Sequence, residues 1–231
     1  MSDALYNAAT LIIPLVIAIV FHEVAHGWTA LMLGDPTAKE RRRLSLNPLR
    51  HVDPVGTVIV PGILALVKAP IFGWAKPVPV IKQRLDNPRF GMMAVAAAGP
   101  ATNFVLALLG AVALGLLVRG HDGGAPAIGA ATRFLVANLN NFLVINIFLA
   151  LFNLLPIPPF DGSHIVEGLL PRRAAHLYER LRPLGFPLVF LILIGLPMLL
   201  PGLNLVERFV LPPVIWLVEH YYALARAVAV A

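Results

Sequence analysis

Two histidines and a glutamate stand within a strongly apolar stretch near the N-terminus. His22 and His26 are four residues apart, and Glu23 lies between them. An α-helix places residues i and i+4 one above the other on a single face, so both imidazoles can bind one metal ion. Glu23 then stands beside the first ligand and can take a proton from a metal-bound water. The spacing therefore predicts a hydrolytic metal site, for which zinc is the usual ion.

A pair of histidines packed between helices is the plain alternative. Such pairs are common in soluble proteins, but three ionisable groups inside an apolar span are costly unless they have a function. We therefore favour a metal site over a packing role.

The third metal ligand has to come from elsewhere in the chain, because catalytic zinc usually takes three protein ligands and leaves a fourth position for water. Asp161 is the best candidate, since it directly follows a run with three prolines that must break a helix. His164 competes with it, because it stands three residues later on the same helical face and imidazole binds zinc well. We favour Asp161 because of the motif described below.

Several other polar residues fall in apolar segments. Asn146 and Asn153 are two helical turns apart, so they share a face and should point inward. We predict that Asn153 binds the substrate backbone. Asn103 could do the same, but we favour a role in joining helices, as polar residues in membranes do. The stretch from His51 to Asp53 is interpreted as a turn at the membrane surface.

The composition indicates a membrane protein. Of the 231 residues, 58% are hydrophobic and 13% are charged, and the mean hydropathy is +0.81, which is outside the range of soluble domains. Cysteine is absent, which excludes disulfides and thiolate metal sites. The net charge of +6 comes from basic residues in loops between apolar runs, which favours cytoplasmic loops over nucleic-acid binding.

The apolar runs predict an all-α polytopic membrane protein with about five transmembrane helices. We expect a single membrane-embedded domain over residues 1–231, because the chain has no room for a separate soluble module. Prolines and a glycine near 201–206 divide the last apolar stretch. The predicted core helices are 5–33, 91–118 and 132–155, and the predicted C-terminal helices are 184–200 and 207–225.

A short re-entrant and β-strand insertion is predicted at about 55–81, between the first two spans. Residues 55–67 are too few for a span and contain Pro61-Gly62, so they should dip into the bilayer and return. Residues 72–80 alternate valine with proline, which is typical of an edge strand or an extended loop. A plain proline-rich connector is an equally good interpretation.

Charge predicts the orientation. Basic residues cluster in 39–50, 82–89 and 172–182, which should therefore be cytoplasmic. The N-terminus and the loop 119–131 have few basic residues and are predicted to lie outside, and five spans then place the C-terminus in the cytoplasm. From His26 to Lys39 is 13 positions, about 20 Å if helical, so the metal should lie in the cytoplasmic half of the bilayer.

Three motifs together resemble the site-2 protease family of intramembrane zinc metalloproteases, in its compact form without a PDZ domain. They are His22 to Gly27, the N-x-x-P-x-x-P-x-D-G pattern from Asn153 to Gly162, and Gly99 to Asn103. The resemblance covers most of the chain. It implies that His22, His26 and Asp161 bind one zinc ion, that Glu23 is the catalytic acid and base, and that the first three long helices form the catalytic core.

We therefore expect a zinc endopeptidase of the cell membrane that cleaves transmembrane proteins or peptides within or near the cytoplasmic half of the bilayer. The substrate helix must unwind to expose a carbonyl, and residues 74–80 could then bind it by β-augmentation. Any regulatory or adaptor domain would be a separate protein.

Two rival interpretations stay open. One is a membrane-anchored zincin that acts on cytosolic segments, although such enzymes typically need a polar domain around the motif. The other is a transporter or sensor that binds a metal ion without hydrolysis.

Overall fold

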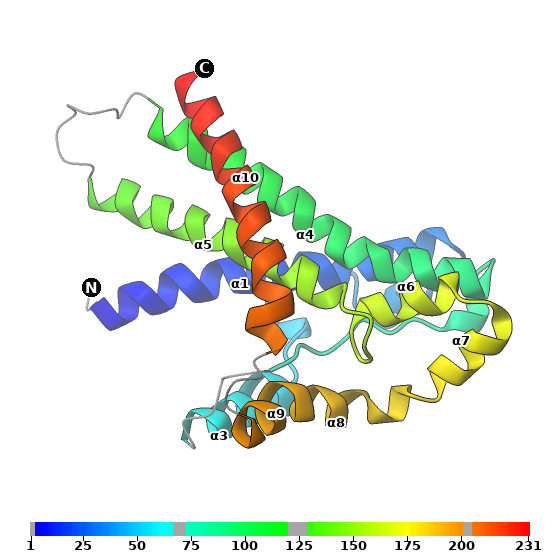
Figure 1. Ribbon diagram of the computed structural model, residues 1–231. Coiled ribbons are helices and arrows are strands. Elements are labelled where there is room, and N and C mark those ends of the chain that lie inside the picture. The colour runs from blue at the N-terminus through cyan, green and yellow to red at the C-terminus, as the bar shows by residue number, and fades with distance from the viewer. Residues whose placement is uncertain (1–2, 67–72, 120–128, 201–204) are drawn as a thin grey trace.

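A computed structural model describes residues 3–66, 73–119, 129–200 and 205–231. These residues are mostly helical and contain no β-strand. Three long helices form the centre of the molecule (Figure 1): α1 (Asp3–Met32), α4 (Pro88–Val118) and α5 (Ala130–Asn153). All three are long and apolar enough to cross a membrane. The all-α fold and the three core helices are therefore confirmed, with bounds that differ from the predicted ones by only a few residues.

The outer surface of the bundle is apolar, whereas its interior is built on small residues. On α1, Leu11, Ile12 and Trp28 are more than half exposed. On α4, Ala107 and Ala111 are fully buried against α5 and α10. Small residues let helix backbones approach closely in a bilayer, and a soluble monomer rarely exposes so much apolar surface. The arrangement identifies lipid as the solvent of these helices.

Short elements surround the bundle, and most of them connect or follow the long helices. They are α2 (Thr37–Glu40), η1 (Pro48–Arg50), η2 (Pro54–Ile59), α3 (Val60–Leu66), η3 (Lys82–Arg84), α6 (Asp161–Leu169), α7 (Arg172–Glu179), η4 (Arg182–Leu184), α8 (Gly185–Phe190), η5 (Leu191–Gly195), α9 (Leu196–Leu199) and η6 (Val206–Val210). A fourth long helix, α10 (Leu211–Val230), ends the chain.

The insertion between the first two spans is helical and extended, without a strand. Residues 54–66 form η2 and α3. Residues 73–81 are here called the extended segment. In it, the Trp74 N–H donates to the Gly56 carbonyl (3.1 Å) and the Lys76 N–H donates to the His51 carbonyl (2.8 Å). These acceptors lie in turns and short helices, so no ladder forms and the strand prediction is not met. The re-entrant course stays a prediction, because its return at 67–72 lies outside the described residues.

The three basic segments lie together at one end of the molecule, which we call the basic end. Arg84 pairs with Glu40 (Nη1 to Oε2, 2.9 Å), which joins the second segment to the first. Lys82 and Arg182 both pair with Glu167, which joins the second segment to the third. Helices α6 and α7 lie here (Figure 1). This grouping is what a shared cytoplasmic face requires.

Both termini lie at the opposite end. Near the start of α1, the Tyr6 hydroxyl donates to the Arg133 carbonyl at the start of α5 (3.2 Å). Near the end of α4, Gly115 packs so closely on α10 that a Cβ there would lie 2.4 Å from the Ala225 carbonyl oxygen. The ends of α1 and α10 therefore meet the same end of the bundle, as Figure 1 also shows.

The number of spans stays a prediction: five spans would place the two termini on opposite faces, whereas the first and last described helices reach the same end of the bundle. The predicted fourth span is the run α8–η5–α9, from Gly185 to Leu199. A run of this length reaches about 22 Å at 1.5 Å per residue, less than the ~30 Å hydrocarbon core. Three of the described helices meet the criteria for a span, and α10 is the remaining long helix that runs between the two ends.

Single-cysteine labelling tests the position of the termini, since the chain has no cysteine of its own. Asp3→Cys and Ala231→Cys should react with a membrane-impermeant maleimide from the same side of sealed vesicles. Arg172→Cys, at the basic end, should react only from the other side. Labelling of positions 3 and 231 from opposite sides would contradict the arrangement.

Candidate metal centre

Three ligand atoms from two separate helices converge on one point. The His22 and His26 Nε2 atoms are 3.0 Å apart. The Asp161 Oδ2 atom lies 3.1 Å from His22 Nε2 and 3.3 Å from His26 Nε2. These three side chains form a group that can hold a metal ion. The structure therefore brings together the three residues that the sequence indicated as ligands.

The other ring nitrogens fix the direction in which the two imidazoles point. His22 Nδ1 lies 2.6 Å from Asn103 Oδ1, and His26 Nδ1 lies 2.7 Å from the Val95 carbonyl oxygen. Both partners are acceptors, so each Nδ1 carries the proton and donates it. Each Nε2 therefore presents a lone pair to the shared point, which is the arrangement in which a second-sphere partner orients a metal-binding histidine.

The donor set fits a zinc ion. Two imidazole lone pairs and a carboxylate oxygen facing one another would repel in a buried place without a cation between them. Asp161 Oδ2 is buried and receives no hydrogen bond from the residues that the structure describes. Neighbouring ligands of tetrahedral zinc, with bonds of about 2.0–2.1 Å, lie about 3.3 Å apart, close to the three separations given above. Three protein ligands also leave a fourth position free.

Asp161 reaches the centre from a short loop that leaves α5. Helix α5 ends at Asn153, three prolines prevent its continuation, and Asp161 then opens α6. The Tyr178 hydroxyl donates to the Pro156 carbonyl (2.7 Å) and holds this loop against α7. The loop and the start of α6 thus bring the Asp161 carboxyl group to the two imidazoles.

Gly99 of α4 provides the room for the two imidazoles. A Cβ at this position would lie 2.5 Å from His26 Nε2 and 2.6 Å from His22 Cε1. No side chain larger than hydrogen fits against the ligand atoms here. The glycine of the Gly99 to Asn103 motif is thus explained by direct contact with the metal-binding rings.

Asn103 lies one helical turn after Gly99 and connects three helices. Its side chain is fully buried. Its oxygen accepts from His22, while its amide nitrogen donates to Asn146 Oδ1 (2.7 Å) and to the Ala18 carbonyl (3.3 Å). The sequence indicated helix joining, and the structure adds the orientation of a metal ligand. The available signal was the spacing of four from Gly99, which places both residues on one face.

Glu23 is held by the extended segment. Its Oε2 atom accepts a hydrogen bond from the Val78 N–H (2.8 Å). Val78 in turn packs on Gly27, where a Cβ would lie 2.9 Å from the valine Cγ1. No hydrogen bond from the described part of the chain reaches the other carboxylate oxygen of Glu23. That oxygen is free to accept a proton.

The remaining candidates do not belong to the ligand group. The Asn153 amide donates to the Leu149 carbonyl of its own helix (2.9 Å), and its role toward substrate stays a prediction. Asn146 is fully buried, as predicted. His164 Nδ1 faces Arg182 Nη2 at 2.9 Å. Asp53 caps the start of η2 through the Val55 and Gly56 N–H groups, in agreement with the predicted turn.

Replacement of Gly99 tests the close packing at the centre. Gly99→Ala should weaken zinc binding by about 10- to 100-fold, the usual effect of disturbing groups that orient metal ligands, because the new methyl group displaces both rings. Competition with a chromogenic chelator measures the affinity. Gly129→Ala is the matched control, since a Cβ at 129 meets nothing within 4 Å. Equal affinities for both variants would refute the packing argument.

Comparison with known proteins extends these observations. The family model described as "Peptidase family M50" matches residues 125–196, which include α5 and Asp161. A Bacillus subtilis protein named "Putative zinc metalloprotease YwhC" is 38% identical over 81% of this chain and 81% of its own length. Proteins named "Putative zinc metalloprotease Rip2" from Mycolicibacterium smegmatis and Mycobacterium tuberculosis are each 28% identical. They cover 81% and 80% of this chain, and 65% and 66% of their own lengths, respectively.

No solved structure matches the chain significantly. The similarity to the Bacillus subtilis relative extends over most of both chains and accompanies a group of the three expected residues that could hold a metal ion. The resemblance inferred from the motifs is thus confirmed, and the protein belongs to peptidase family M50, the site-2 protease family.

Proposed function

We propose that this protein is an intramembrane zinc endopeptidase of the cell membrane, which hydrolyses peptide bonds of transmembrane proteins or peptides near the cytoplasmic face. One observation carries the proposal: His22, His26 and Asp161 direct three ligand atoms to one point. The two histidines stand on a helix apolar enough to span a bilayer, and Glu23 follows the first of them in the sequence. The family membership and the names of the relatives agree with a zinc metalloprotease.

Each residue has a defined role in this proposal. His22, His26 and Asp161 hold the ion, which when bound supplies a Lewis acid and an activated water. Glu23 accepts the proton of the attacking water on its free oxygen and later delivers it to the leaving amine. The Val78 N–H donates to Glu23 Oε2 and so limits the orientations that the carboxylate can take. Asn103 and the Val95 carbonyl hold the two imidazoles in the tautomer that binds metal.

The depth of the centre supports cleavage near one face. His26 is six residues before the end of α1 at Met32, about 9 Å along the helix axis. The helix does not continue to Lys39, because the chain turns at Gly34 with a positive φ of 97°. The distance from His26 to the end of the helix is therefore shorter than the one expected for an unbroken helix to Lys39. The centre therefore lies within the apolar helix but close to the basic end. We propose that the basic end is cytoplasmic and that both termini lie outside.

The rival interpretations have less support. A zincin acting in the cytosol would need a polar domain around the motif, whereas His22 and His26 stand on a helix whose outer face is apolar. A transporter or sensor would bind the ion but would have no use for a carboxylate beside the ligands. Glu23 therefore separates a protease from a metal-binding protein without activity.

Replacement of Glu23 tests the proposed chemistry. Glu23→Gln should retain one zinc per chain, measured by atomic absorption, because no ligand is changed. Its turnover of a transmembrane reporter peptide in detergent should fall by at least about 100-fold, in line with the loss of a general base. Asp53→Asn, which changes a carboxylate at a turn away from the centre, is the control. Full turnover by Glu23→Gln would exclude the proposed role.

The extended segment is proposed to bind the unwound substrate. The N–H groups of Trp74, Lys76 and Val78 are used within the protein. In extended backbone, alternate residues face opposite edges, so the other edge belongs to residues 75, 77 and 79. Two of these are prolines, which donate no hydrogen bond. This edge mainly offers carbonyl acceptors, of which the Pro77 oxygen also receives a long hydrogen bond from Arg43 Nη2 (3.5 Å). Such acceptors suit the N–H groups of an unwound substrate in lipid.

Replacement of residues 76–80 by a flexible Gly/Ser segment tests this binding mode. Cleavage of the transmembrane reporter should fall sharply, through a raised KM, because the ordered acceptor edge is lost. Zinc content should be unchanged, since the segment supplies no ligand. Unchanged turnover would remove the segment from the mechanism.

A further inference from the structure

The position of Asp161 depends on a helix too short to be stable by itself. Helix α6 has nine residues, from Asp161 to Leu169, and isolated helices of this length are marginal in water. The metal centre needs the Asp161 oxygen within a few tenths of an ångström of its place. The contacts that fix α6 against the rest of the protein therefore decide whether the third ligand meets the two histidines.

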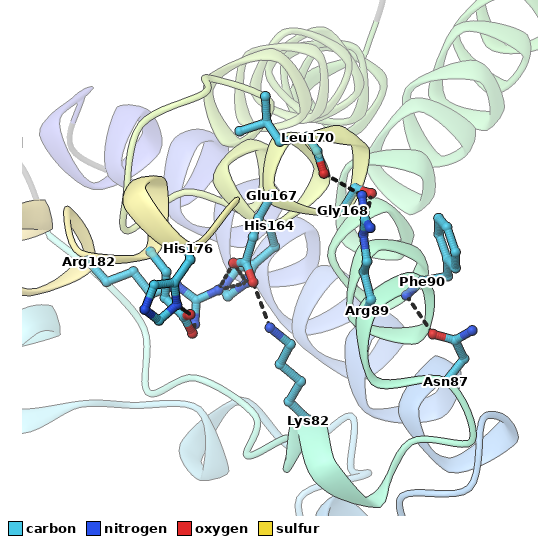
Figure 2. A network of polar contacts seen from close by, with 11 residues as sticks. Lys82, Asn87, Arg89, Phe90, His164, Glu167, Gly168, Leu170, His176 and Arg182 are labelled. Carbon is cyan, nitrogen blue, oxygen red and sulfur yellow. Dashed lines mark hydrogen bonds and ion pairs between the residues drawn. The ribbon is translucent and has the colours of Figure 1, made fainter. Parts of the chain in front are cut away.

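A nearly buried carboxylate near the end of α6 provides such contacts (Figure 2). Glu167 is 8% exposed. Its Oε1 atom lies 2.6 Å from Lys82 Nζ, and its Oε2 atom binds Arg182 Nη2. Burial raises the pKa of Glu167, but the hydrogen bond from Lys82 and the charge of Arg182 outweigh it and lower the pKa overall. Glu167 is thus an ionised group with a cation on each oxygen.

His164, one turn earlier on α6, belongs to the same cluster. Its Nδ1 atom faces Arg182 Nη2 at 2.9 Å, as Figure 2 shows. Burial and the positive charge of Arg182 lower the pKa of His164 to about 4. The ring is therefore neutral at physiological pH and accepts a hydrogen bond from Arg182. This engagement gives His164 a structural partner in place of the metal role that its sequence position allowed.

The partners of α6 come from segments that reach other parts of the centre. Lys82 opens η3 directly after the extended segment, whose Val78 N–H holds Glu23. Arg182 opens η4, which leads from α7 into α8. At the C-terminal end of α6, Arg89 of α4 donates to the Gly168 carbonyl (3.0 Å) and to the Leu170 carbonyl. The helix is thus held from three directions.

We propose that Glu167 is a positioning residue of the metal centre, which with Lys82 and Arg182 holds α6 in the place where Asp161 meets His22 and His26. The proposal rests on the metal site but not on proteolysis. Because Lys82 is joined along the chain to the extended segment, the same carboxylate also ties the segment that holds Glu23 to the helix that carries Asp161. Removing the buried carboxylate from this partly buried cluster leaves the two cations without their partner, so α6 should shift.

Zinc affinity and the spectrum of bound cobalt test this role. Glu167→Gln, purified as the full chain, should bind zinc about tenfold more weakly in chelator competition, near the lower limit for changes in outer ligand shells. The d–d absorption of the Co²⁺-loaded variant should lose intensity, because a displaced Asp161 leaves tetrahedral geometry. Glu40→Gln is the matched control, since it removes a carboxylate from an exposed pair with Arg84 whose side chains are 54% and 45% exposed.

Substitution of Lys82 provides a second test, in which Glu167 itself is unchanged. Lys82→Met should weaken zinc binding in the same direction, whereas Lys82→Arg should restore it because the positive charge is retained. Wild-type zinc affinity and cobalt spectrum in both Glu167→Gln and Lys82→Met would overturn the proposal. A wild-type protein that binds zinc but cleaves no peptide would refute the proposed protease function and leave the role of Glu167 standing.

Discussion

The structure depends on the close approach of two imidazole lone pairs and one carboxylate oxygen in a place shielded from water. Such an arrangement is repulsive between the imidazoles and leaves a buried acceptor unsatisfied, unless a cation occupies the shared point. Neighbouring groups hold the three ligand atoms in this close arrangement. Asn103 and the Val95 carbonyl take the proton-bearing side of each ring, and Gly99 removes the side chain that would otherwise separate the ligands.

Two kinds of structure surround the centre: long helices that face lipid, and polar elements at the basic end. The long helices α1, α4 and α5 face lipid with large apolar side chains and pack on small residues, so they give a rigid frame for the two histidines. The polar elements gather at the basic end, where charged side chains can be paired. They supply the third ligand through α6 and the Val78 N–H that holds Glu23. The proposed hydrolysis within a membrane would need both, because lipid excludes water and a polar end admits it.

The prolines near the centre act through the backbone, because proline has no N–H group and cannot continue a helix. Prolines after α5 end that helix and release Asp161 from its axis. In the extended segment, prolines leave the N–H groups of alternate residues for contacts with the protein and remove donors from the opposite edge. An edge with few donors is a poor template for self-association, which would suit the proposed binding of a substrate there.

The sequence by itself determined the features that depend on local periodicity and composition. The spacing of His22 and His26 defines one helical face, the long apolar runs define the three central helices, and the motif around Asp161 identified the third ligand. These signals lie within a few turns of chain, where geometry is fixed by the helix itself.

Only the tertiary structure decided which distant groups meet. Asn103 reaches His22 across 81 positions, Val78 reaches Glu23 across 55, and Lys82 reaches Glu167 across 85. It also replaced the predicted strand with an extended segment whose N–H groups bind turns, and it placed both termini at one end. Pairing and packing between remote segments depend on the whole arrangement of helices, and no local pattern in the chain records them.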